Sequence, residues 1–288
     1  MPPAFTLHPA TATATAAPLL LDSPHSSSHF PPDFDHAVTQ ADLRQGEDMF
    51  IEQLFGDAPR HGAPLLEAGF ARTYIDPNRH AGDVDLELLA GAWPDEHRPS
   101  GKARIGKALI WRTLLDGRPI YARRLRVAEV QHRIEHYLLP YQQALASLIA
   151  QTHARHGVSY HLNCHSMGAT ASTSGEGEPG TVRADFVLGD RDGTTCASEF
   201  TALVRDTLTG LGYEVKINDP YKGVELVRAW SNPAAGRHSL QIEVNKRLYM
   251  NDDAPTRSAR FDSLKSDLNR LLAVLAQHAR QQARERSA

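Results

Sequence analysis

Short apolar segments recur along the chain, and most are followed at once by polar residues. Residues 17–21 are apolar and end at Asp22, Ser23 and Pro24, which is the pattern of a buried strand that runs into a loop. Apolar or alternating segments predict further strands at residues 70–75, 160–164, 185–189, 213–217 and 239–245. Polar clusters therefore lie where predicted strands end.

Longer segments place apolar side chains on one helical face. In residues 127–156, Val130 and Ile134 belong to such a face, and Pro140 is expected to kink the helix. Residues 82–117 are rich in Gly and Pro without a clear period, so we expect a long excursion that covers an active site. Further helices are predicted at residues 45–55, 198–211 and 261–282.

Alternating strands and helices indicate an α/β fold, a three-layer sandwich with a mixed, mostly parallel sheet between helices. We expect residues 17–288 to form a single domain. Residues 1–16 are rich in Pro, Ala and Thr and are expected to be a flexible leader. This segment lacks the basic start and apolar core of a signal peptide.

Charge and cysteine content narrow the possible partners. The 31 Lys and Arg residues nearly balance 34 Asp and Glu residues without long runs of one sign, which argues against binding nucleic acid. No apolar stretch is long enough to span a membrane. Cys164 and Cys196 are too few for a disulfide framework, as expected in the cytoplasm. A small molecule is therefore the expected partner.

Candidate site residues follow from the ends of the predicted strands, where open α/β sheets bind ligands. His25 and His165 each follow a strand, as do Asn78 and Arg79, and Glu243 lies on a late strand. Imidazole ligands, a carboxylate that moves a proton and a cation that holds an anionic substrate are what zinc-assisted hydrolysis requires.

Each of these residues also has an ordinary structural interpretation. A single histidine after a strand is more often structural than a ligand, and the chain has no HExxH helix and no paired-cysteine zinc motif. A serine nucleophile at Ser166 is disfavoured, because Cys164 occupies a position where the nucleophile-elbow motif requires glycine.

Five motifs together resemble the N-formylglutamate amidohydrolase family, whose zinc carboxypeptidase-like and aspartoacylase-like relatives have a mixed sheet between helices. The resemblance covers about residues 19–275, and the closing segment 247–250 also fits. The motifs, in order, are Ser23-Pro24-His25-Ser26, Asp76-Pro77-Asn78-Arg79, Asn163-Cys164-His165-Ser166-Met167, Asn218-Asp219-Pro220-Tyr221-Lys222-Gly223 and Gln241-Ile242-Glu243-Val244-Asn245.

The resemblance implies one zinc ion with His25 and His165 as ligands. Aspartoacylase-like relatives carry a glutamate three residues after the first histidine, but Ser28 occupies that position here. Asp48 matches an acidic position of the family and is the candidate for the third ligand. Its alternative role is to stabilise a helix N-terminus, in which case His29 or Asp22 would be the ligand.

The resemblance also implies roles for residues around the metal. Glu243 matches the catalytic glutamate of carboxypeptidase-like enzymes, which takes a proton from water and delivers it to the leaving amine. Asn78 and Arg79 match a pair that binds a substrate carboxylate. Lys222 and Arg228 are candidates for the second carboxylate of a glutamyl group, and Asn245 is expected to line the same polar wall as Glu243.

The expected function is zinc-dependent hydrolysis of N-formyl-L-glutamate to formate and glutamate, a step of histidine degradation. The substrate is then a small anionic N-acyl amino acid. Two alternatives remain: hydrolysis of another N-acyl amino acid or small peptide, and non-catalytic binding of a small molecule on the same fold.

Overall fold

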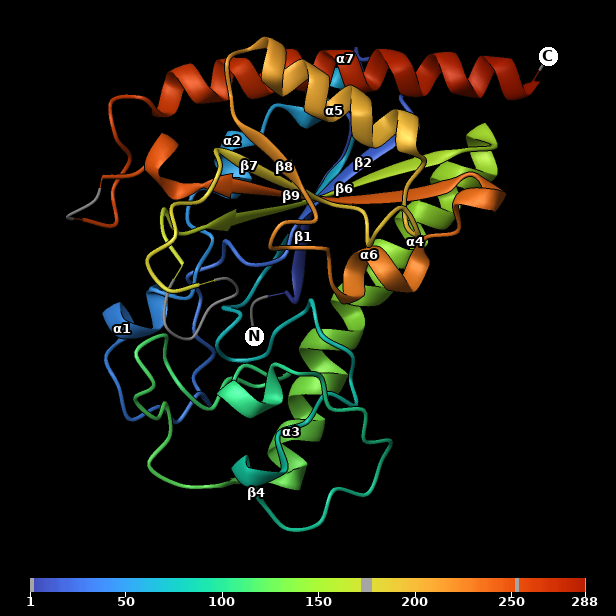
Figure 1. Cartoon of the computed structure of the whole chain (residues 1–288). Coiled ribbons are helices and arrows are strands. Elements are labelled where there is room, and N and C mark those ends of the chain that lie inside the picture. The colour runs from blue at the N-terminus through green and yellow to red at the C-terminus, as the bar shows by residue number, and fades with distance from the viewer. Residues whose placement is uncertain (1–2, 172–177, 252–253, 288) are drawn as a thin grey trace.

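A seven-stranded sheet forms the centre of the computed structural model, which describes residues 3–171, 178–251 and 254–287 (Figure 1). The strand order is β1-β3-β2-β6-β9-β7-β8. β1 and β7 run antiparallel to β3 and β9 respectively, whereas the other pairs are parallel. The strands are β1 Phe5–His8, β2 Leu19–Ser23, β3 Leu65–Ala68, β6 Ser159–Met167, β7 Phe186–Gly189, β8 Val215–Ile217 and β9 Arg237–Asn245.

Helices cover both faces of this sheet, so the predicted mixed and mostly parallel α/β sandwich is confirmed (Figure 1). α2, α5 and α7 lie on one face, and α4 and α6 pack on β2, β6 and β9 on the other. The helices are α1 Gln40–Arg44, α2 Ile51–Leu54, α3 Val127–Arg133, α4 Leu139–His156, α5 Ser198–Gly210, α6 Glu225–Trp230 and α7 Phe261–Ser287.

The two faces of the central strands differ in polarity. Alternate residues such as Leu162 and Ile242 join the core under α5 and α7. The residues between them, among them Asn163, His165 and Glu243, are polar, yet they are also buried. Buried polar groups are kept only where they have hydrogen-bond partners or serve a function. We therefore look for the functional site on this second face.

Two predicted elements are wrong. Residues 70–75 are not a strand, because Phe70 and Tyr74 pack as part of a turn into the core beside α4, and the sheet contains β3 instead. Of the helix predicted over residues 45–55, only residues 51–54 are α-helical, as α2, since Phe50 adopts a left-handed conformation with φ of 67°; α1 ends earlier, at Arg44. Asp48 therefore lies in the connection before α2.

The long helix over residues 127–156 is present, and its helical period changes just before Pro140. A π-helical turn at Ile134–Leu138 joins α3 to α4, and Pro140 lies in the first turn of α4. A proline lacks the N–H that an interior helical residue donates, and a helix start does not require that donor. The change of helical period thus accommodates Pro140.

The two segments expected to be irregular differ from each other. Residues 5–8, assigned above to a flexible leader, form β1 and pair with β3; Met1 and Pro2 lie outside the described residues. The excursion over residues 82–117 contains only short 3₁₀ turns and β4 (Leu89–Ala90), which pairs with β5 (Leu125–Arg126). Among the described residues, no helix is both long and apolar enough to cross a membrane.

The buried ring of His238 on β9 should make folding stability depend on acid pH. It stacks on Tyr160 with ring centroids 4.8 Å apart, and its Nδ1 accepts the Ala197 N–H. Burial, with the charge of Arg286, lowers the pKa of His238 to about 4. Below about pH 6.5 the unfolded chain therefore binds more protons, and stability decreases as the pH falls towards about 4.

His238→Asn, which retains an acceptor near Nδ1, should flatten this decrease. The measurement is the free energy of unfolding of both proteins by urea titration between pH 7 and pH 4. Two curves that stay parallel across this range would contradict the role of His238.

Candidate active site

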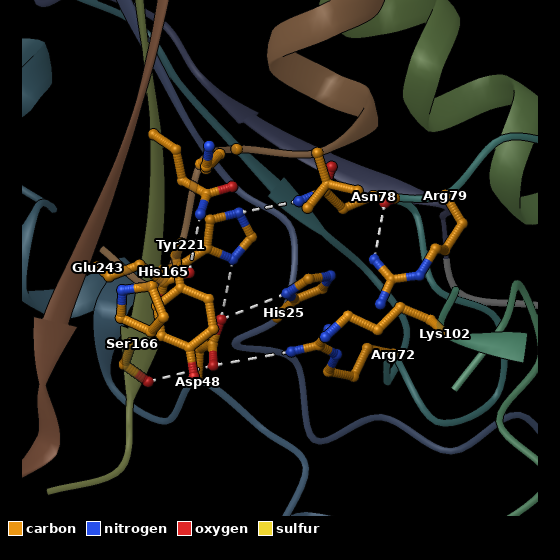
Figure 2. A pocket seen from close by; sticks show the side chains of 15 residues that line it. His25, Asp48, Arg72, Asn78, Arg79, Lys102, His165, Ser166, Tyr221 and Glu243 are labelled. Atoms are coloured by element: carbon orange, nitrogen blue, oxygen red, sulfur yellow. Dashed lines mark hydrogen bonds and ion pairs between the residues drawn. The ribbon is translucent and has the colours of Figure 1, made fainter. Parts of the chain in front are cut away.

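A cavity of about 390 Å³ lies at the carboxyl ends of β2, β6 and β9 (Figure 2). The loop after β2 brings His25, the connection before α2 brings Asp48, and β6 brings His165. The remaining lining residues come from the turn after β3, the excursion, β6, the loop before α6 and β9: Arg72, Asn78, Arg79, Lys102, Ser166, Pro220, Tyr221, Lys222, Gly223, Val224, Gln241 and Glu243.

His25, Asp48 and His165 converge on one point. The centroids of the His25 and His165 rings are 4.7 Å apart. Asp48 Oδ2 lies 3.3 Å from Nδ1 of His25 and 3.1 Å from Nδ1 of His165. One potential ligand atom from each of the three buried side chains lies within 4.8 Å of the others. Ligands at zinc–nitrogen and zinc–oxygen bond lengths are separated by about 3.3 Å in a tetrahedron, so the group has the spacing to hold a metal ion.

The other ring nitrogens fix which atoms face this point. His25 Nε2 lies 2.7 Å from Asp76 Oδ1, and since a carboxylate only accepts, Nε2 carries the proton. Asn163 donates its amide N–H to Asp22, which leaves its oxygen to accept the Nε2 proton of His165 at 2.7 Å. With Nε2 facing these acceptors, each ring turns its Nδ1 towards Asp48 Oδ2, where the neutral form of the ring presents a lone pair.

Lone pairs and a carboxylate oxygen repel one another unless a cation lies between them. Burial lowers the pKa of His165, which favours its neutral form. Burial alone would raise the pKa of Asp48, yet this pKa lies well below its usual value, and the charge of Arg72 is one of the causes. An anionic carboxylate with two neutral imidazoles, each oriented through its second nitrogen, is a ligand set that suits zinc.

Further contacts fix the ligands. Ser166 donates its hydroxyl to Asp48 Oδ1 at 3.1 Å and so helps to position that carboxylate. Behind Asn163, the carboxylate of Asp22 also accepts the Tyr141 hydroxyl and the His161 ring. This chain of bonds runs from α4 through β2 to the ring of His165.

Basic side chains surround the cavity next to the ligands. Arg72 pairs with Asp76 at 2.8 Å and lies 3.9 Å from Asp48. Arg79 donates to the backbone oxygens of Asn78 and Lys107, which fixes its guanidinium at the cavity (Figure 2). Such a preset guanidinium suits a carboxylate, which it can bind through two hydrogen bonds.

Glu243 lies on β9, the strand next to the one that carries His165. The parallel register of β6 and β9 sets Glu243 opposite His165 and Gln241 opposite Asn163, on the same face. Gln241 donates its amide N–H to Glu243 Oε1 at 2.9 Å, and both side chains line the cavity. A carboxylate is thus presented to the cavity within a buried, hydrogen-bonded strand.

The structure brings most of the predicted site residues together but not all of them. Asn78, Arg79, Lys222 and Glu243 line the cavity with the three potential ligands. Arg228 does not line it, because it lies on the exposed side of α6 in an ion pair with Glu225. Asn245 does not either: its amide donates to the backbone oxygens of Arg183 and Ala184, and its oxygen caps the turn that follows β9.

The two alternatives to Asp48 lie elsewhere in the network. Asp22 is occupied by three donors behind Asn163, and His29 is not part of the ligand group formed by the described residues. Three further residues of the site were not assigned from the sequence. These are Arg72, Asp76 and Asn163; the last two each lie two residues before a candidate, Asn78 or His165, within the motifs quoted above.

Comparison with known proteins agrees with this arrangement. A family model described as N-formylglutamate amidohydrolase matches residues 17–250. N-formylglutamate deformylases from Pseudomonas aeruginosa and Pseudomonas putida are 27% and 26% identical over 244 and 246 residues, in both cases 83% of this chain and 84% of the relative.

A crystal structure of N-formylglutamate amidohydrolase from Ralstonia eutropha superposes with a TM-score of 0.92 at 43% identity, covering 98% of this chain and 99% of that one. A protein from Agrobacterium tumefaciens, with a TM-score of 0.67 at 16% identity, shares the fold. With the family model spanning residues 17–250, which include all three potential ligands, the chain belongs to the N-formylglutamate amidohydrolase family.

Proposed function

We propose that the protein is a zinc-dependent amidohydrolase that converts N-formyl-L-glutamate to formate and L-glutamate. The observation that carries this proposal is that the Nδ1 atoms of His25 and His165 lie 3.3 and 3.1 Å from one oxygen of Asp48. The names of the relatives supply the substrate. We also propose that the enzyme is cytoplasmic and that it acts in histidine degradation, as the family resemblance implies.

His25, Asp48 and His165 would hold the zinc ion, which would supply a Lewis acid for the acyl carbonyl and for the attacking water. The protein's own residues then move protons and hold the substrate. Glu243 accepts a proton from the attacking water and returns it to the nitrogen of the leaving amine, which is the role of a general base and then a general acid.

Arg79 binds a substrate carboxylate and so fixes the scissile amide beside Glu243 and the metal ligands. Its support is the guanidinium held in place by two backbone oxygens at the cavity wall. Asn78 supports the same wall, because its oxygen accepts the Leu226 N–H at 2.9 Å. Orienting the substrate in this way contributes to the rate independently of proton transfer.

The substrate and the metal dependence can be tested together. The zinc-loaded protein should hydrolyse N-formylglutamate with a higher kcat/KM than N-formylmethionine or N-acetylglutamate, measured as release of the free amino acid. A chelator should abolish this activity, and added zinc should restore it, because the ligand set suits a divalent metal. Full activity in protein shown by elemental analysis to be metal-free would contradict the proposal.

Glu243→Gln tests the proton transfer. The amide retains the size of the side chain but cannot accept the proton, so we expect kcat to fall by about 10²- to 10⁴-fold. The zinc content should remain at the wild-type level, since Glu243 is not part of the ligand group. Unchanged turnover in this variant would remove Glu243 from its assigned role.

Asp48→Asn, with His29→Ala as its control, tests the third ligand. Asp48 supplies the only carboxylate among the three grouped ligands in the described part of the chain, so losing its charge should lower zinc affinity by about tenfold or more. His29→Ala should retain zinc. Competition with a chromogenic chelator measures both affinities, and the reverse result would identify His29 as the ligand.

A further inference from the structure

A second cavity of about 230 Å³ adjoins the first. The two share lining residues, including Asp48, Arg72 and Arg79, so they meet beside the potential metal ligands. Six basic side chains and one carboxylate, that of Asp48, are among the residues that line this second cavity. Its basic residues are Arg72, Arg79, Lys102, Lys107, Arg183 and Lys246.

Two of these cations, the buried Lys107 and the partly buried Lys246, are bonded to neutral oxygens. Lys107 is 4% exposed, and its ammonium donates to the backbone oxygens of Thr113 and Leu114. The ammonium of Lys246 donates to the backbone oxygen of Glu47 at 2.6 Å. Within the described residues neither lysine forms an ion pair. A buried charge without a counter-ion is costly, and an ammonium has three donors, so each lysine is suited to receive an anion.

The cavity also has an apolar wall. Lys107 lies 4.5 Å from the centroid of the Trp111 ring, and Arg72 lies 4.8 Å from it. Trp111 fits there because residue 46 is glycine: a Cβ at Gly46 would lie 2.9 Å from the indole. Met167 and Leu115 line the same cavity. Apolar surface beside cations matches a short methylene arm that ends in a carboxylate.

The residues assigned from sequence to a second carboxylate are less suited to it. The ammonium of Lys222 pairs with Asp192 at 2.9 Å, and its side chain is 56% exposed. Arg228 pairs with Glu225 outside the cavity. An exposed ion pair contributes little to specificity, because solvent screens it.

We propose that this second cavity binds the side-chain carboxylate of a dicarboxylic N-acyl amino acid, with Lys107 and Lys246 as its countercharges and Arg79 reserved for the other carboxylate. This inference rests on the proposed function. Arg183 adds a third cation, stacked over the Tyr221 ring that lines both cavities. Burial lowers the pKa of Lys107 to about 7, and a bound carboxylate opposes that change because it stabilises the charged ammonium.

The test compares N-formylglutamate with N-formylglutamine, which has the same shape but a neutral side chain. In the zinc-loaded wild-type protein we expect kcat/KM to favour the glutamate by at least about 100-fold, because a site built for a charged group rejects its neutral analogue. Lys107→Met and Lys246→Met should each reduce this preference by at least about tenfold, mainly through a higher KM for the glutamate.

The preference is a ratio within one preparation, so partial unfolding or incomplete zinc loading does not change it. The control is Lys265→Met, which removes a lysine on α7 that pairs with Asp57 and lines neither cavity. This variant should keep the wild-type preference for N-formylglutamate over N-formylglutamine. A preference that persists in both cavity variants would overturn the inference while leaving the proposed function intact. Failure of the wild-type protein to release formate from any N-formyl amino acid would instead overturn the proposed function.

Discussion

The orientation of two imidazole rings is the constraint on which the rest of this site depends. Each ring can direct a lone pair at Asp48 only because its other nitrogen is held as a donor, by Asp76 for His25 and by Asn163 for His165. These partners are themselves fixed, Asp76 by Arg72 and Asn163 by Asp22. The ligand geometry is therefore a property of a buried network, which keeps the rings in one tautomer and one rotamer.

The sheet makes this network possible by separating its two faces. The face under α5 and α7 is apolar and supplies the packing that stabilises the central strands. On the other face, the register of β6 and β9 aligns polar residues in two neighbouring rows, including the pair His165 and Glu243. Because the faces alternate residue by residue, a shift of one residue in this register would move the polar rows into the apolar core.

The charges around the two cavities suit an anionic ligand on both sides of the ligand group. Arg79 is fixed at the first cavity by backbone oxygens, and the lysines of the second cavity are held in the same way. Backbone oxygens position the two lysines without neutralising them, whereas Arg79 also lies 3.7 Å from Asp76 and 3.9 Å from Asp83, and Lys222 is held in an exposed ion pair. Each carboxylate of a dicarboxylic amino acid would thus lie beside a cation. The same contacts would orient this substrate and favour it over substrates with one carboxylate.

The sequence by itself determined the elements with clear periodicity and the residues carried by motifs. The alternating β9 and the long helix that ends at His156 were predicted, as were the candidates His25, Asp48 and His165. Only the tertiary structure decided that Asp48 joins the two rings, since the positive φ of Phe50 breaks the expected helix and leaves Asp48 in a connection.

The tertiary structure likewise excluded Arg228 and Asn245 from both cavities and brought Arg72, Lys107 and Lys246 to the walls of the second one. Local sequence encodes the period of an element and the chemistry of its side chains. Which cations lie near one another, and which are neutralised, depends on loops distant in sequence that meet only when the sheet and its two cores form.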